Sequence, residues 1–216
     1  MTSAASKGLT RGLLISFEGG DGVGKSTQLT LLAEWLRARG HDVVTTREPG
    51  GTPLGVKLRD VVMHGDHVSP HAEALLYAAD RAHHVETVIR PALAANAVVL
   101  TDRYLDSSVA YQGNGRDLGA DEVERLNLWA VDGLLPDLTV LLDLDPGVGL
   151  SRLTGDPDRL ESAGAEFHAR ARQAFLDRAA SGDPRWLVVN GADDVEAIQA
   201  QIRARTARLF EPDGRP

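Results

Sequence analysis

GGDGVGKS, at residues 19–26, is the stretch that decides the fold. It matches the phosphate-loop pattern G-x-x-x-x-G-K-[ST], and it lies between an apolar run at 13–17 and a stretch with helical spacing at 25–39. In that setting the backbone N–H groups of the loop point at phosphate oxygens, and the start of the following helix favours anions. The stretch therefore predicts a site for the phosphates of a nucleoside triphosphate.

Individual loop residues have separate expected tasks. The glycines permit backbone conformations that side chains obstruct, Lys25 can reach the β- and γ-phosphates, and the Ser26 hydroxyl can bind Mg²⁺. The flanking strand and helix favour this interpretation over a glycine-rich turn with a solvated lysine. The residues expected to contact the triphosphate are Gly19, Gly20, Asp21, Gly22, Val23, Gly24, Lys25, Ser26 and Thr27.

Bulk composition narrows the class of protein. The chain has 216 residues, 43% hydrophobic and 25% charged, which is typical of one α/β domain. Its net charge of −8 argues against binding a nucleic-acid polymer, which needs a basic face. The absence of cysteine excludes disulfides and thiolate metal sites. No signal-peptide core or run of membrane-spanning length occurs in the sequence, so we expect no membrane partner and a cytoplasmic protein.

Short apolar segments alternate with helix-compatible stretches along the chain. This alternation predicts crossover connections and a three-layer α/β/α fold, with a five-stranded, mostly parallel sheet and flanking helices. We expect a mobile extension at 1–10, a single domain at 11–210 and a tail at 211–216. The expected strands are at 12–19, 42–49, 97–104, 138–145 and 185–191.

Capping residues predict where the helices begin and end. Gly40 should end the first helix, and Ser69-Pro70 should open a long helix that reaches about residue 95. Another helix should start at Asp121 and end near Gly133. The later helices should be opened by Asp145-Pro146, continue over 161–180, and finish with a last helix capped by Asp193.

Asp102-Arg103 lies at the end of the third expected strand, with the phosphate loop one strand away. Asp102 could organise Mg²⁺ through its water shell, and Arg103 could offer a planar fork to an acceptor phosphate. By itself the pair could equally be a capping aspartate beside a surface arginine. The neighbouring phosphate loop favours the functional interpretation.

Three segments in order resemble the signatures of the thymidylate kinase family, in its bacterial form. They are FEGGDGVGKST, TREPGGTPLG and DRYLDSSVAYQG, and the similarity extends over about residues 12–210. The resemblance implies a P-loop NTPase-type fold of the nucleoside monophosphate kinase kind, with a lid. It also implies transfer of the γ-phosphate of ATP to dTMP, giving dTDP, with Mg²⁺ bound to the phosphates of ATP. Members of the family usually form homodimers, so the resemblance implies a homodimer here.

The resemblance also assigns a binding site for dTMP. Tyr77 would stack on thymine where the family usually has phenylalanine, and its hydroxyl would then need water or a partner. Ser108 and Gln112 would bond the base edge, Tyr111 would crowd the sugar, and Asp21 would face the acceptor sugar and phosphate. The full expected set is Glu48, Arg59, Tyr77, Arg81, Arg103, Ser108, Tyr111 and Gln112.

Some family members carry a catalytic arginine inside the phosphate loop, where this chain has Gly22. The bacterial alternative places arginines on a lid, expected here at about 152–160. We expect Arg159, and secondarily Arg152, to close over the ATP phosphates, although each could be a solvated loop arginine. With Lys25, Asp21 and Arg103, these two arginines complete the expected catalytic set.

Two alternative functions also fit these motifs. A deoxynucleoside kinase also combines a phosphate loop with an aspartate–arginine pair, but it would need a carboxylate base and would reject a monophosphate. A nucleotide-binding regulator without catalysis would not need the intact Lys25, Ser26, Asp102 and Arg103. An N-K-x-D guanine-reading motif is missing from the sequence, which disfavours a GTPase switch. Leu126, Leu128 and Trp129 could belong to the core or to a subunit interface.

Overall fold

A computed structural model describes residues 11–154, 156 and 158–211 of the chain. Its centre is a five-stranded sheet in the order β2-β3-β1-β4-β5, and every adjacent pair is parallel. All five predicted strands are confirmed, while the expected extension at 1–10 and most of the tail at 211–216 lie outside the described residues. The strands are β1 (Leu13–Glu18), β2 (Val43–Arg47), β3 (Val98–Asp102), β4 (Leu138–Asp143) and β5 (Trp186–Asn190).

Helices connect the strands and form the two outer layers. The α-helices are α1 (Lys25–Arg37), α2 (Pro53–His64), α3 (Pro70–His84), α4 (Arg90–Ala94), α5 (Leu105–Ser108), α6 (Ala120–Ala130), α7 (Pro146–Ser151), α8 (Ala165–Ala179) and α9 (Val195–Arg208). Two π-helical segments, η1 (Val85–Ile89) and η2 (Val109–Gly115), and one 3₁₀ segment, η3 (Glu161–Ala163), complete the elements.

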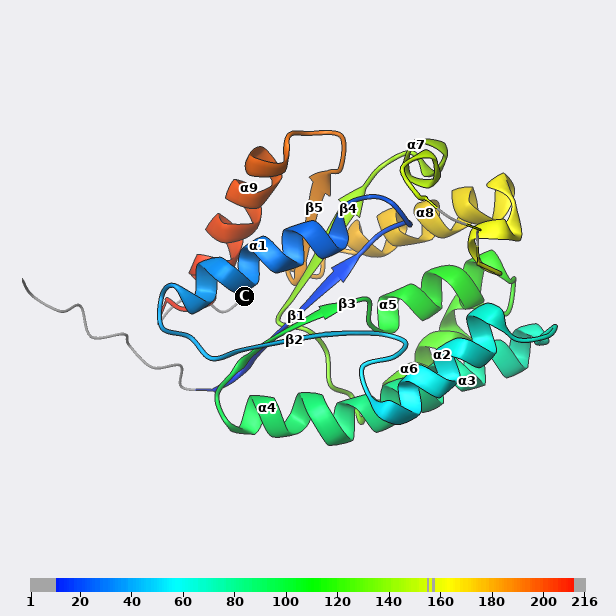
Figure 1. Ribbon diagram of the computed structural model, residues 1–216, viewed down its shortest axis with the longest axis horizontal. Helices are drawn as coiled ribbons and strands as arrows, with labels where there is room; N and C mark the ends of the chain where they lie inside the picture. The colour runs from blue at the N-terminus through cyan, green and yellow to red at the C-terminus, as the bar shows by residue number, and fades with distance from the viewer. Residues whose placement is uncertain (1–10, 155, 157, 212–216) are drawn as a thin grey trace, which may run out of the picture.

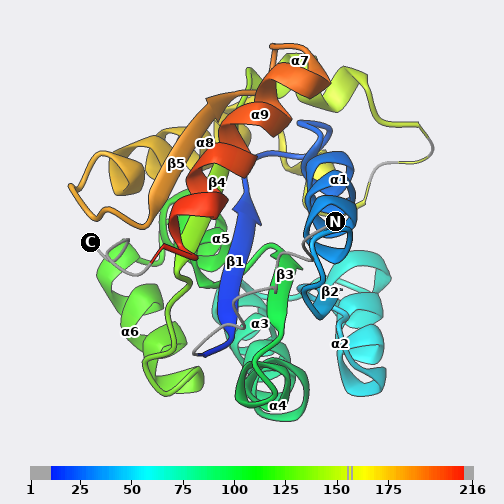
Figure 2. The same ribbon diagram turned by 90° about the vertical axis from the view of Figure 1, so that its left-hand side faces the viewer.

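The sheet is covered on both faces, as Figure 1 shows with α1 and α9 on one side and α4 on the other. Alternation along β1 explains this: Ile15 packs in the cluster that includes α1 and α9 residues, whereas Leu14 packs with Val99 and Ile89 on the opposite face. Figure 2 shows β1 in the middle of the sheet, between β3 and β4. Nearly continuous apolar strands therefore indicated a doubly covered parallel sheet correctly.

The helix boundaries agree with the sequence in part. Asp145 caps α7 as expected, since its side chain accepts hydrogen bonds from the N–H groups of Gly147 and Val148. The long helix expected up to residue 95 is instead the succession α3, η1 and α4. Asp194, not Asp193, is the N-cap residue of α9, because the Asp193 carboxylate accepts a hydrogen bond from Asn190 in the preceding turn.

The chemistry-bearing loops all leave the same edge of the sheet. Parallel pairing brings the carboxyl ends of β1, β2, β3 and β4 together, and the phosphate loop and the segments 48–52 and 103–108 follow three of them. Within the part of the chain that the structure describes, no helix is both long and apolar enough to cross a bilayer.

Candidate active site

The phosphate loop joins β1 to α1 through backbone conformations that require glycine. Gly24 is the N-cap of α1 with φ 98°, in the left-handed region. Gly19 has φ 127°, and a Cβ atom there would lie 2.4 Å from the carbonyl oxygen of Leu142. The Val23 side chain is buried in the core, so only its backbone is free to serve a ligand. The loop is therefore built as a backbone cradle.

Lys25 lies in the first turn of α1, and its side chain folds back over the loop. Its Nζ atom donates hydrogen bonds to the carbonyl oxygens of Gly19, at 3.3 Å, and Gly20, at 2.6 Å. Burial and the nearby Arg103 charge lower the pKa of Lys25, although the surrounding carboxylates oppose this. A phosphate group entering the loop would offer this amine a stronger, charged acceptor.

Ser26 and Asp102 form the candidate Mg²⁺ site. The Ser26 Oγ atom donates to Asp102 Oδ2 at 3.0 Å, which joins the start of α1 to the end of β3. Hydroxyl and carboxylate oxygens are ligands that Mg²⁺ prefers. Among the described residues, no group of three or more His, Cys, Asp or Glu side chains is placed to hold a metal. The pair fits an ion that takes its remaining ligands from phosphates and water.

Arg103 lies beside the phosphate loop in a strained backbone conformation, with φ 70°. One guanidinium nitrogen donates to the Gly19 carbonyl oxygen at 2.9 Å and to Ser107 Oγ at 3.2 Å. The other nitrogen forms an ion pair with Asp21 at 2.5 Å. Burial raises the pKa of Asp21, but the charges of Arg103 and Lys25 outweigh it and hold that pKa below the ordinary value. Arg103 and Asp21 are thus locked to each other at the loop.

Glu18 supports Arg103 from behind. Its fully buried carboxyl group accepts hydrogen bonds from the Tyr104 backbone N–H at 2.8 Å and from Ser107 Oγ at 2.5 Å. Burial, and then the neighbouring Asp106, raise the pKa of Glu18 to about 8. Ser107 therefore links a buried carboxyl group to the guanidinium that faces the cavity.

Two cavities meet at this edge of the sheet. The inner pocket, of about 580 Å³, is lined by all eight residues predicted for dTMP, together with Asp21 and residues of the segment before α8 that include Asp158 and Glu161. The phosphate-loop cleft, of about 950 Å³, is lined by Asp21, Gly22, Gly24, Lys25, Ser26, Thr27, Asp102 and Arg152 among others. Five residues line both cavities: Asp21, Glu48, Arg59, Arg103 and Glu161.

Arg81 on α3 is fully buried at the base of the inner pocket. Its Nε atom pairs with Glu48 at 2.6 Å, and its terminal nitrogens donate to Ser108 Oγ at 3.0 Å and to the Tyr104 carbonyl oxygen at 3.1 Å. It also contacts the Asn127 side-chain oxygen. The guanidinium is therefore held in one orientation before any ligand arrives.

Glu48 connects Arg81 to the edge of the sheet. Its second carboxylate oxygen lies 2.8 Å from His84 Nδ1, and the other ring nitrogen of His84 lies 2.7 Å from Thr46 Oγ1. On α2, Arg59 donates to the Pro49 carbonyl oxygen at 3.1 Å and lines both cavities. The segment after β2 thus contributes the buried carboxylate of Glu48, and α2 places the guanidinium of Arg59 where the two cavities meet.

Aromatic rings form the walls of the inner pocket. Tyr111 lies 5.1 Å from the Arg103 guanidinium and packs edge-on against Phe175. Tyr77 is buried, and its hydroxyl has no hydrogen-bond partner among the described residues. Burial, and then the charge of Glu73, raise the pKa of Tyr77. The hydroxyl that distinguishes Tyr77 from phenylalanine is therefore left for a ligand or water.

The two predicted lid arginines lie in different places. Arg152 ends α7, lines the phosphate-loop cleft, and approaches the Gly22 carbonyl oxygen at 3.5 Å. Arg159 does not line this cleft, contrary to expectation. It donates to the Val62 carbonyl oxygen at 2.8 Å and forms an ion pair with the buried Glu73 at 2.9 Å. The buried carboxylate attracts Arg159 toward α2 and α3.

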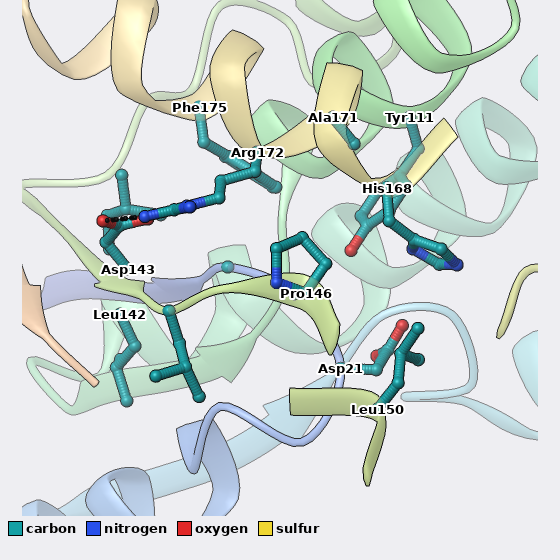
Figure 3. A pocket seen from close by; sticks show the side chains of 14 residues that line it. Asp21, Tyr111, Leu142, Asp143, Pro146, Leu150, His168, Ala171, Arg172 and Phe175 are labelled. Atoms are coloured by element: carbon teal, nitrogen blue, oxygen red, sulfur yellow. Dashed lines mark hydrogen bonds and ion pairs between the residues drawn. The ribbon is translucent and has the colours of Figure 1, made fainter. Parts of the chain in front are cut away.

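A third cavity, of about 400 Å³, lies behind the phosphate loop. Figure 3 shows Tyr111, Ala171 and Phe175 on one side of it, and Pro146 and Leu150 on the other. Close packing joins α7 to the loop beside this cavity: a Cβ atom on Gly22 would lie 1.9 Å from the Gly149 carbonyl oxygen. An arginine at position 22 would therefore displace α7.

Sequence reasoning missed the residues that hold the site from behind. They are Glu18, Glu73, His84, Ser107, Arg116 and Asn127, none of which belongs to the predicted set. One signal for Glu73 was present: Glu73, Tyr77 and Arg81 are four residues apart and share a face of α3. The remaining contacts join segments distant in sequence.

Comparison with known proteins agrees with this architecture. The family profile described as Thymidylate kinase matches residues 17–202. The chain is 62% identical to a thymidylate kinase of Clavibacter sepedonicus, over 92% of this chain and 96% of that protein. It is 49% identical to that of Deinococcus radiodurans, over 91% and 97% of the two chains.

A solved structure extends the similarity to three dimensions. The crystal structure of thymidylate kinase from Ehrlichia chaffeensis superposes with a TM-score of 0.76 at 32% sequence identity, covering 90% of this chain and 98% of that one. The phosphate loop, the strand order and the relatives agree, and the chain belongs to the thymidylate kinase family, which phosphorylates dTMP to dTDP with ATP.

Proposed function

We propose that the inner pocket binds dTMP, that the phosphate-loop cleft binds the phosphates of ATP, and that the phosphoryl group crosses between them beside Arg103. One observation carries this proposal: the eight residues expected to bind dTMP line a single pocket, and that pocket shares Asp21 and Arg103 with the cleft. Shared walls bring an acceptor phosphate and a donor phosphate close together, and proximity supplies much of the catalysis in phosphoryl transfer.

On the acceptor side, the thymine ring stacks on Tyr77 and its edge bonds to Gln112, Ser108 and Arg81. The acceptor phosphate binds Arg59 and Arg103, whose guanidinium groups reach the junction of the two cavities. Since Arg81 and Arg103 are already held by protein partners, they lose little freedom on binding.

On the donor side, the loop backbone holds the β- and γ-phosphates, Lys25 turns from the loop carbonyl groups to the phosphates, and Arg152 closes from the lid. Ser26, and Asp102 through its water shell, would hold Mg²⁺, which would neutralise phosphate charge. Both residues present oxygen atoms at the cleft, as that ion requires.

Positioning and positive charge, without a strong base, account for the chemistry. The acceptor is already a phosphate anion, so no buried carboxylate has to remove a proton from a hydroxyl. Lys25, Arg103 and Arg152 surround the path of the transferring group, and Asp21 holds Arg103 in place. Stabilising negative charge on the transferring phosphoryl group is the main task of such sites.

A panel of acceptors tests this proposal. Purified protein with ATP and Mg²⁺ should consume ATP with dTMP, more slowly with dCMP, and not with thymidine or purine monophosphates. The matched variants are Arg103→Met, which removes the shared cation, and Arg125→Met, which removes an exposed one. Arg103→Met should lower kcat/KM for dTMP about 10³-fold, and Arg125→Met should leave it unchanged. ATP use with thymidine but not with dTMP would refute the acceptor assignment.

We also propose that two copies of the chain associate through α2, α3 and α6, which lie together in Figure 1. Large apolar side chains are exposed on all three helices: Trp129 is 81% exposed, Leu75 57% and Val56 54%. Exposed apolar groups gathered over neighbouring helices favour an interface. Light scattering after gel filtration should give twice the 23.1 kDa chain mass, and Trp129→Asp should give the single chain. A monomeric wild-type protein at micromolar concentration would exclude this interface.

A further inference from the structure

We infer that Glu73 is a positioning residue that sets the orientation of the Gln112 amide, and through it the preference for thymine over cytosine. The carboxylate of Glu73 is fully buried on α3, and its Oε1 atom accepts a hydrogen bond from Gln112 Nε2 at 2.9 Å. This inference rests on the proposed placement of the base beside Gln112.

The two ends of an amide side chain are chemically different, and the carboxylate distinguishes them. An ionised carboxylate only accepts hydrogen bonds, so the NH₂ group of Gln112 must face Glu73. Turning the amide over would press two acceptor oxygens together in a buried site. Gln112 therefore directs its nitrogen to Glu73, and its Oε1 atom has no donor among the described residues.

Two arginines pair with the buried carboxylate of Glu73. Arg116 donates to both carboxylate oxygens, at 3.3 and 3.2 Å, and Arg159 pairs with Oε2 at 2.9 Å. Pairing on this scale is what allows a charge to remain inside a protein. Arg159 lies in the segment predicted as the lid. Because it pairs with Glu73, it acts on the base pocket and not on the donor phosphates.

The chemistry of the bases turns this orientation into selectivity. Thymine carries a hydrogen on N3 and donates it, whereas N3 of cytosine is an acceptor. A Gln112 oxygen presented to the pocket therefore accepts from thymine and meets an acceptor in cytosine. Uracil has the same N3–H as thymine, so selectivity against dUMP does not depend on the orientation of the Gln112 amide.

Glu73→Gln tests the inference, because it keeps the shape of the side chain but lets the Gln112 amide turn over. We expect the ratio of kcat/KM for dTMP over dCMP to fall about tenfold, while the ratio for dTMP over dUMP is unchanged. The KM for ATP should also be unchanged. An unaltered dTMP-to-dCMP ratio in the folded variant would overturn the inference.

A double-mutant cycle with Gln112→Leu separates this inference from the proposed function. If Glu73 acts through Gln112, adding Glu73→Gln to Gln112→Leu should change the dTMP-to-dCMP ratio no further. An equal tenfold fall in both backgrounds would show that Glu73 does not act through Gln112. If Gln112→Leu alone leaves that ratio at the wild-type value, Gln112 does not read the base, and the proposed placement of the base fails together with this inference.

Glu73→Asp is the second variant, for the case in which Glu73→Gln does not fold. It keeps the negative charge for Arg116 and Arg159 but withdraws the acceptor from Gln112 by one methylene group. We expect the same loss of selectivity against dCMP with unchanged selectivity against dUMP. A folded Glu73→Asp protein with the wild-type dTMP-to-dCMP ratio would contradict the inference.

Discussion

The phosphate-loop cleft and the inner pocket are built in opposite ways, although they share a wall. The cleft is centred on the backbone of one short contiguous segment, the phosphate loop, with side chains from other segments around it, and Arg152 approaches the Gly22 carbonyl oxygen at 3.5 Å. The inner pocket is made of side chains from distant segments, and its cation Arg81 is fully buried, with a protein partner for each of its three guanidinium nitrogens. The cleft can therefore adjust around a ligand, whereas the inner pocket is preorganised.

Removing the lysine of the cleft should have the largest effect on turnover. Lys25→Met deletes the amine that transfers from the Gly19 and Gly20 carbonyl groups to the phosphates. We expect kcat to fall about 10³-fold in steady-state assays, with little change in the KM for dTMP, because the loss is confined to the donor side. Lys57→Met, on the exposed part of α2, is the matched control and should retain wild-type rates. Equal losses in both variants would contradict the assignment.

The next largest effects are expected when each of the two predicted lid arginines is replaced by alanine. The two variants should distinguish a role on the ATP side from a role on the dTMP side. Arg152→Ala should lower kcat about 10²-fold, because this side chain faces the cleft. Arg159→Ala should keep kcat within about threefold but raise the KM for dTMP about tenfold, since Arg159 pairs with Glu73. Initial rates measured at varied dTMP and saturating ATP distinguish the two patterns. The reverse pattern would return Arg159 to the donor phosphates.

A pair of glycine substitutions should measure how tightly the loop is packed. Gly22→Ala adds a Cβ atom 1.9 Å from the Gly149 carbonyl oxygen, and we expect kcat/KM for ATP to fall about tenfold. Gly40→Ala shares the positive φ but meets no atom within 4 Å, so it should cost about 1 kcal/mol of stability without a kinetic effect. Kinetics and thermal unfolding of both variants test this. Similar kinetics in Gly22→Ala and Gly40→Ala would mean that α7 moves away from the added Cβ atom without affecting ATP binding.

A pH dependence of stability, separate from any kinetic effect, is expected from Glu18. Its pKa is raised from an ordinary 4.5 to about 8, so the native state holds this proton more tightly than the unfolded chain. The resulting stabilisation is complete below pH 4.5 and is lost as the pH rises through 8. Between pH 5 and 9, urea unfolding should show wild type losing about 2–4 kcal/mol relative to Glu18→Gln. Parallel pH profiles would show that Glu18 is ionised throughout.

Contacts between residues that are close in sequence could be predicted, whereas most contacts between residues that are far apart in sequence could not. The phosphate loop was predictable because Gly19, Gly24 and Lys25 act within one short segment, where spacing alone sets the geometry. Asp102 was placed beside Ser26 because carboxyl ends of parallel strands share one edge. Arg159 pairs with Glu73, which is buried on a helix far away in sequence, so spacing alone gave no sign of this contact. Its expected role at the ATP phosphates stays a prediction.

By itself the sequence determined the fold class, the five strands, the phosphate loop and the family, because these depend on periodicity and on motifs of adjacent residues. Only the tertiary structure decided which side chains stand behind the site. Glu73, Asn127 and His84 each form hydrogen bonds with residues far away in sequence. Because an unpaired polar group is costly when it is buried, each of these side chains needs a specific partner. The buried carboxylate of Glu73 likewise pairs with Arg159 across the fold.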